Sequence, residues 1–211
     1  SKRALRWFAP LTIERKANLM TKSKVPLSMA VLPLRNSVFF PRQVMPLSIG
    51  RESSILVVEE ALKDEGHVVI VAQTDGNIEK PTEKDIYWFG TLAKVLKQFT
   101  LADGTRSVLM QGLERVQLIS ILHSEPYIRA VVRECDETKE RGMEIDAMTT
   151  NLKNLFKKAV ELSPNLNEEQ LSIILNTEEP STVADIITSL IPVSVEEKQR
   201  ILETLDLRKR L

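Results

Sequence analysis

The first half of the chain places hydrophobic residues at alternate positions or in short runs between turn residues, a pattern that predicts β-strands. The predicted strands span residues 29–34, 44–49, 67–72, 87–100, 106–111, 114–122 and 127–134. Residues 51–65 interrupt the series, because their hydrophobic positions recur every three or four residues and predict one helix. Asp103 and Gly104 form a pair typical of a tight hairpin turn. We therefore expect a partly closed antiparallel β-barrel or sheet with one helix that plugs or flanks it.

The second half changes to the hydrophobic period of a helix. The predicted helices span residues 145–162, 167–175, 180–191 and 194–205. Asn167 with Gln170 and Ser194 with Glu197 have the spacing of capping boxes. Because each helix is hydrophobic on one side, the helices must pack against one another in an all-α bundle. Asp206 predicts a further helix start, which we expect to lead into a longer helix of a parent chain. The fold class is therefore α+β.

Charge divides the chain further. Lys and Arg (29) balance Asp and Glu (29) overall, which argues against a protein that coats nucleic acid or an anionic membrane by charge alone. Residues 1–26 carry seven Lys or Arg residues and one Glu, so this arm has a net charge of +6 and the remainder −6. The arm is either a flexible or partner-docked segment or an organelle-targeting peptide. The predicted parts are the basic arm 1–26, the β-rich subdomain 27–136 and the helical bundle 137–211.

A search for catalytic and metal-binding motifs finds none. The seven glycines form no phosphate-binding loop, and the sequence has no Gly-Lys-Ser/Thr, G-x-S-x-G or H-E-x-x-H pattern. His67 and His123 fall at predicted strand ends. Cys135 lies between two acidic residues, which would raise the pKa of its thiol and make it a poor nucleophile. We expect no catalytic residue, no metal site and no cofactor in this chain, and with one cysteine a reducing compartment.

Adjacent aromatic residues are the remaining candidates for function. Phe39 and Phe40 are neighbours, and so are Tyr87, Trp88 and Phe89. Because neighbouring strand residues point to opposite faces, either these segments are covered on both sides or one aromatic in each faces outward for a partner. A surface that holds many unfolded chains would be apolar and adaptable, a use that suits methionine. The candidate substrate contacts are Phe39, Phe40, Met45 and Trp88.

The segment Val31–Pro41 (VLPLRNSVFFP) and the segment Met45–Ser54 that follows it resemble the opening of the amino-terminal domain of Lon, the ATP-dependent protease. The resemblance covers residues 27–211 and continues, in order, through 71–73, 89–93, 101–105, 108–116, 180–191 and 198–205. It implies a PUA-like β subdomain followed by a helical bundle. It also implies structural roles for Pro33, Leu34, Arg35, Asp103, Gly104, Gly112 and Arg115, with Arg35 and Arg115 tying strands together through carboxylates or carbonyls.

In the Lon family this region helps to select unfolded or degron-bearing proteins and supports assembly of the homohexamer. The resemblance therefore implies that the partners are unfolded or damaged proteins and other copies of the parent. It also implies that ATP, Mg²⁺ and the Ser-Lys dyad belong to downstream parts, so that this chain by itself is not an enzyme. Two alternatives stay open: a free-standing Lon-domain adaptor, and a PUA-like RNA-binding protein, against which the −6 charge of residues 27–211 argues. The expected location is the cytoplasm, with the mitochondrial matrix as the alternative.

Overall fold

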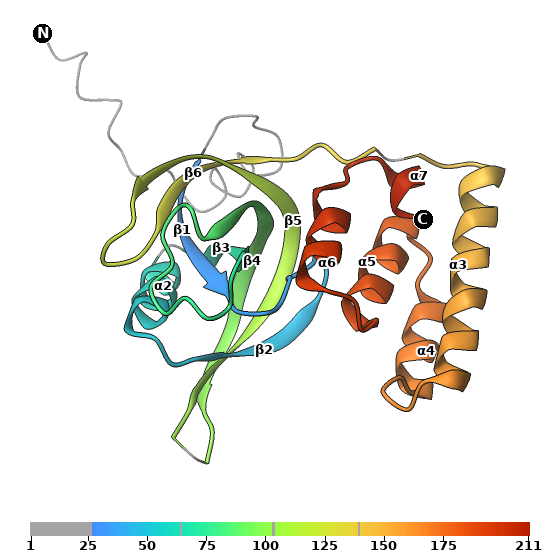
Figure 1. Ribbon diagram of the computed structural model, residues 1–211, viewed down its shortest axis with the longest axis horizontal. Helices are drawn as coiled ribbons and strands as arrows, with labels where there is room; N and C mark the ends of the chain where they lie inside the picture. Colours follow the sequence, from blue (N-terminus) through green and yellow to red (C-terminus); the bar gives the residue numbers. More distant parts are fainter. Residues whose placement is uncertain (1–26, 64, 103, 139) are drawn as a thin grey trace, which may run out of the picture.

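The computed structural model describes residues 27–63, 65–102, 104–138 and 140–211, and it places a β part beside a helical part (Figure 1). The basic arm and Asp103 lie outside the described residues. The β part comprises β1 (Leu27–Leu34), β2 (Val44–Ile49), α2 (Glu52–Lys63), β3 (His67–Gln73), β4 (Ile86–Thr100), β5 (Arg106–His123) and β6 (Arg129–Glu134). The helical part comprises α3 (Met143–Leu162), α4 (Glu168–Asn176), α5 (Pro180–Leu190), α6 (Val195–Glu203) and α7 (Leu207–Arg210). This arrangement confirms the α+β fold class.

The sheet has six strands in the order β2-β5-β4-β3-β1-β6, and β6 also pairs with β5, which closes it into a barrel. The expectation of a wholly antiparallel sheet is wrong at one pairing. β1 and β3 run parallel, with Val31 opposite Val69 and Leu34 opposite Ala72. Parallel neighbours need a crossover connection, and the segment from β2 through α2 supplies it.

β5 is one long strand, although the sequence predicts two strands at 106–111 and 114–122. It pairs with β2 along its first half and with β6 along its second half, and its register against β4 shifts by one residue opposite Leu92 and Ala93. Gly112 lies at this irregularity, and a Cβ atom there would be 2.3 Å from the carbonyl oxygen of Phe40. Only glycine therefore allows the loop before β2 to cross β5, where the Arg42 amide donates to the Gly112 carbonyl at 2.9 Å.

Two hydrophobic cores lie on opposite faces of the strands. β1 shows why both exist: Val31 and Leu32 are neighbours, and Val31 packs in one core while Leu32 packs in the other. A strand that is covered on both sides is apolar along the covered stretch, as β1 is from Met29 to Leu34 and β3 from Val68 to Ala72. α2 covers the first core with its three- and four-residue stripe, which buries Val57, Val58 and Ala61.

Helices α4 to α7 start where the capping signals predict. The Asn167 side chain accepts from the Gln170 amide, and the Ser194 side chain accepts from the Glu197 amide, so both capping boxes are formed. Pro180 occupies the first turn of α5, and Asp206 caps α7. Their apolar stripes meet in a third core around Phe156, Ile174 and Val183.

A buried ionic cluster joins the β part to the helical part. Arg115 of β5 has no exposed side-chain surface, and its guanidinium donates to both carboxylate oxygens of Asp185 in α5 and to Glu137 at 2.8 Å. It also donates to the Leu202 carbonyl at 3.0 Å, and Arg210 of α7 binds the same two carboxylates. Burial disfavours ionisation of Glu137, but the two guanidinium groups outweigh burial and lower the pKa of this carboxyl. Arg115 thus ties the barrel to helices, whereas the sequence predicted that it ties strands together.

Candidate functional site

Two of the four predicted substrate contacts are buried. Phe39 is 2% exposed in the first barrel core, and Phe40 is 1% exposed in a small core that Val38, Ala72 and Leu202 of α6 complete. The loop before β2 folds over the barrel, and the Thr91 hydroxyl donates to the Phe39 carbonyl to hold it there. The two rings therefore fill cores, and the prediction that they contact a substrate is corrected.

Met45 is half-buried and lies in a groove at one end of the barrel together with Pro33, Leu34 and Arg35. The groove has a volume of about 530 Å³ and runs between the end of β1 and strand β2. Arg35 forms an exposed ion pair with Glu79 at 3.1 Å, which ties the end of β1 to the loop between β3 and β4. The structure thus brings together one predicted contact residue and three residues of the predicted structural motif.

Trp88, the fourth predicted contact, is separate from this groove. It is 39% exposed on β4, while its neighbour Tyr87 packs towards α6. Trp88 does not line the Met45 groove. The predicted contacts therefore do not form one site, and only Met45 and Trp88 remain accessible.

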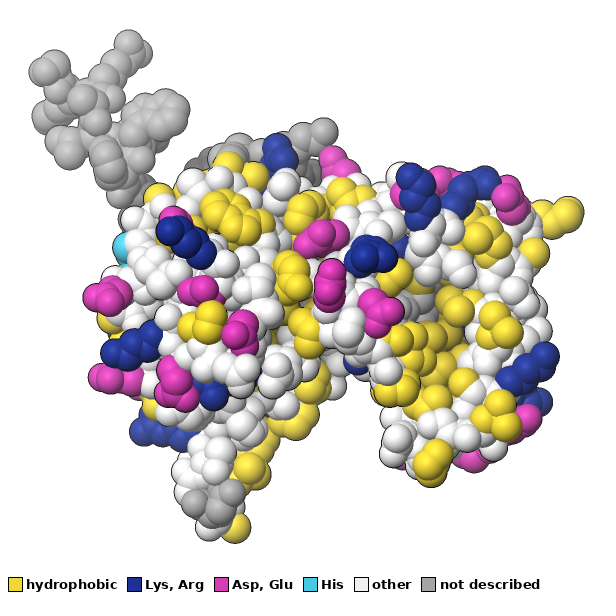
Figure 2. Space-filling model, in the orientation of Figure 1, with side chains coloured by type: hydrophobic (Ala, Val, Ile, Leu, Met, Phe, Trp, Pro, Cys, Tyr) yellow, Lys and Arg dark blue, Asp and Glu magenta, His cyan; other side chains and the backbone are white. Residues whose placement is uncertain are grey.

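A row of apolar side chains on the outer face of the sheet was not predicted. β2 and β5 pair so that Pro46 lies opposite Leu109; on the same face of β4, the exposed Lys97 lies opposite Leu109 and Phe99 lies opposite Ser107. Val44 is 52% exposed beside Pro46. We call Val44, Pro46, Phe99 and Leu109 the apolar strip. In Figure 2 hydrophobic side chains follow the edge of the β part that faces the helices, over β2 and the β4–β5 hairpin.

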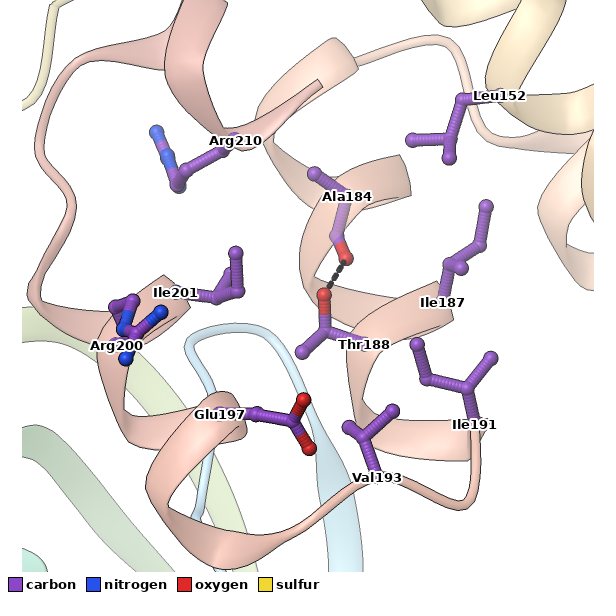
Figure 3. A pocket seen from close by; sticks show the side chains of 10 residues that line it. All are labelled: Leu152, Ala184, Ile187, Thr188, Ile191, Val193, Glu197, Arg200, Ile201 and Arg210. Atoms are coloured by element: carbon purple, nitrogen blue, oxygen red, sulfur yellow. Dashed lines mark hydrogen bonds between the residues drawn. The ribbon is translucent and has the colours of Figure 1, made fainter.

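The helical part contains an apolar pocket that sequence reasoning also missed. It has a volume of about 330 Å³ and lies between α3, α5, α6 and α7. Figure 3 shows its ten lining side chains, which are Leu152, Ala184, Ile187, Thr188, Ile191, Val193, Glu197, Arg200, Ile201 and Arg210. One feature of the sequence could have predicted the pocket: the hydrophobic face of α5, which includes Ala184 and Ile187, is wider than one neighbouring helix can cover.

The described residues offer neither a reactive thiol nor a metal site. Burial is the largest effect on Cys135 and raises the pKa of its thiol to about 11, so at neutral pH the sulfur carries its proton and is a poor nucleophile. Within the described ranges, no group of three or more His, Cys, Asp or Glu side chains could hold a metal ion. In the same ranges, no helix combines the length and hydropathy that a membrane span requires.

Comparison with known proteins identifies the family. The model of the ATP-dependent protease La (LON) substrate-binding domain matches residues 28–211. The chain is 34% identical over 194 residues to Lon protease 2 of Myxococcus xanthus. The matched stretch covers 92% of this chain and 24% of that relative. It is 38% identical over 187 residues to the Lon protease of Dictyoglomus thermophilum. This second match covers 89% of the chain and 24% of the relative. The chain thus spans about a quarter of the length of these relatives.

Solved structures share the fold. The N-terminal domain of the Mycobacterium avium complex Lon protease matches with a TM-score of 0.72 at 21% identity, over 87% of this chain and 94% of that one. The Lon N-terminal domain protein from Xanthomonas campestris matches with a TM-score of 0.62 at 16% identity, with the same coverage of both chains. At these identities the two similarities show the fold alone.

Proposed function

The chain belongs to the family of Lon substrate-binding domains, and from this premise we propose that it recruits unfolded or degron-bearing proteins for an ATP-dependent protease. We assign no step of peptide hydrolysis to its residues. Nucleotide hydrolysis, with its ATP and Mg²⁺, and peptide cleavage belong in this proposal to the remaining three quarters of proteins such as the relatives.

The exposed apolar surface is the observation that carries the proposal. Val44 of the apolar strip is 52% exposed, Val193 at the pocket of the helical part is 37% exposed, and Trp88 is 39% exposed. An unfolded protein exposes the apolar side chains that a folded one buries, so such a surface distinguishes the two by hydrophobic contact. It requires no particular sequence in the client, as suits a protein that handles many substrates.

A direct binding measurement tests the proposal. The purified chain should bind a fluorescently labelled, permanently denatured model protein, and it should not bind the native form of the same protein. Trp88→Ser should weaken this binding with a melting temperature close to that of the unmodified chain, because Trp88 is 39% exposed and its loss removes little core. The proposal fails if the chain does not discriminate between the denatured and native forms.

Assembly and location complete the proposed function. We propose that the domain supports a homohexamer of the parent protein, and sedimentation of the parent with and without this domain would test this role. We place the parent in the cytoplasm, with the mitochondrial matrix as the alternative, and fractionation of the source cells would decide between them.

A further inference from the structure

Helix α3 carries a row of apolar side chains that the third core does not cover. Residues seven apart in a helix lie on nearly the same face, and we call three such residues, Met148, Leu155 and Leu162, the α3 row. Leu155 is 53% exposed and Leu162 is 85% exposed, while Met148 is half-buried. The next residues round the helix, Leu152 and Ala159, pack against the third core. The apolar surface of α3 is therefore wider than its own domain covers.

The spacing of these residues is that of a helix-pairing surface. From Met148 through Leu152, Leu155 and Ala159 to Leu162, the apolar positions recur at alternating intervals of four and three residues. This heptad pattern is the one that packs one helix along another. Figure 1 places α3 at the outer edge of the helical part, on the side away from the β part. A second helix can therefore approach α3 without meeting the barrel.

A polar row runs beside the α3 row and gives it a direction. It consists of Glu144, Asn151 and Lys158, which are exposed, seven residues apart, and three or four positions from members of the α3 row. Glu144 and Glu140 share the guanidinium of Arg208, so one negative charge remains uncompensated at this end of the helix. Lys158 forms no ion pair within the described residues. Beside its apolar row, α3 thus presents an acid at its amino end and a base towards its carboxyl end.

We propose that the α3 row binds the α3 row of a second copy of this chain, with the two helices antiparallel about a two-fold axis beside Asn151. Asn151 lies midway between Glu144 and Lys158, so this alignment brings Glu144 of each copy beside Lys158 of the other. It also packs Met148 of one copy against Leu155 of the other. The two Asn151 amides meet at the axis, where each can donate to and accept from the other.

Charge and size together favour this occupant. An antiparallel pair matches acid with base at both ends, whereas a parallel pair in register would place like charges side by side. One helix pair buries less surface than a stable interface needs, so we expect a dissociation constant on the order of 100 µM. The inference goes beyond the proposed function, because it assigns a surface and an alignment to contact between copies, and client binding does not require that contact.

Sedimentation equilibrium of the unmodified chain, from about 10 µM to about 1 mM, tests for the dimer. Leu155→Asp should raise the dissociation constant at least about tenfold, because a two-fold contact carries the substitution twice and buries both charges. Ile173→Asp is the matched control and should leave the dissociation constant unchanged. Ile173 is 52% exposed, close to the value for Leu155, and lies on α4 outside the α3 row. Thermal melting checks that both variants fold.

Charge exchange between Glu144 and Lys158 tests the alignment. At low ionic strength, Glu144→Lys and Lys158→Glu should each weaken association, because two Lys or two Glu side chains then face each other across the contact. The double variant should associate as the unmodified chain does, and so should an equimolar mixture of the two single variants, since every Lys then faces a Glu. In a parallel pair the single variants would associate no more weakly than the unmodified chain.

The possible failures are distinct. The inference is wrong if the unmodified chain stays monomeric at the highest concentration, or if Leu155→Asp weakens association no more than Ile173→Asp. The antiparallel alignment is wrong if Leu155→Asp weakens association and the single charge variants do not. If the chain is monomeric and Leu155→Asp instead weakens its binding to a denatured protein, a client occupies the α3 row and the inference is overturned. None of these results removes the proposed function, which fails only if the chain does not distinguish denatured from native protein.

Discussion

Replacing Arg115 with Met should destabilise the whole domain. The Arg115 side chain is completely buried, and it donates to Asp185, to Glu137 and to the Leu202 carbonyl. Met has a similar length but no donor, so the substitution leaves Asp185, which is 2% exposed, with only the longer 3.4 Å contact to Arg210. Breaking one partner of a buried ion pair typically costs about 3–5 kcal/mol. For a chain of this length, that loss lowers the melting temperature by about 6–20 °C.

Urea unfolding, followed by circular dichroism and by tryptophan fluorescence, would measure the loss. Arg35→Met is the matched control, because Arg35 also forms an ion pair, with Glu79, but its side chain is 39% exposed. Exposed pairs contribute at most about 1 kcal/mol, so this control should unfold close to the unmodified chain. Combining Arg115→Met with Asp185→Leu should recover part of the loss, since an apolar pair leaves no unpaired buried charge in these two positions. A cost below about 1 kcal/mol for Arg115→Met would refute the reasoning that this cluster holds the two parts together.

Two further predictions concern titratable groups. Because the pKa of Glu137 is lowered from 4.5 in the folded state, its stabilising contribution is complete above pH 4.5 and is lost as the pH falls through the lowered value. In urea unfolding measured at a series of acid pH values, Glu137→Gln should therefore lose stability less steeply with falling pH than the unmodified chain. An unchanged slope would contradict the lowered pKa of Glu137. Because the pKa of Cys135 is raised from 9.0 to about 11, its thiolate fraction at pH 8 should be about a hundredfold lower than that of an ordinary thiol, and iodoacetamide should label it correspondingly slowly. Labelling of the folded chain as fast as that of the urea-unfolded chain would contradict this second prediction.

Local signals were predicted well because they depend on residues close in the chain. Strand β2 has the predicted bounds, and the capping boxes at Asn167 and Ser194 start their helices as expected. The break predicted within β5 failed because Gly112 looks like a turn residue in the sequence. Glycine is required at position 112 because the carbonyl of Phe40, a residue remote in the chain, leaves no room there for a side chain.

The candidate site was predicted less well. Aromatic residues were reasonable candidates, but whether an aromatic residue faces solvent depends on what else packs over its strand. Phe39 and Phe40 belong to the loop before β2, which packs onto the barrel and buries both rings, whereas Met45 and Trp88 stay accessible. Asp185 was overlooked because it lies outside the hydrophobic stripe of α5, and its burial depends on its contact with Arg115 of β5. Neither the apolar strip nor the pocket could be read from the chain, because each combines residues from three or more elements.

The sequence by itself determined the order and type of the elements, the division into a β half and a helical half, and the family resemblance. These properties follow from hydrophobic period, turn residues and caps, which act over a few neighbouring positions. Only the tertiary structure decided that β1 runs parallel to β3, that Arg115 joins the barrel to α5, and that an apolar pocket lies between α3, α5, α6 and α7. These features arise from contacts between residues 38 to 87 positions apart, and hydrophobicity sets which side chains are buried without specifying which partners they meet.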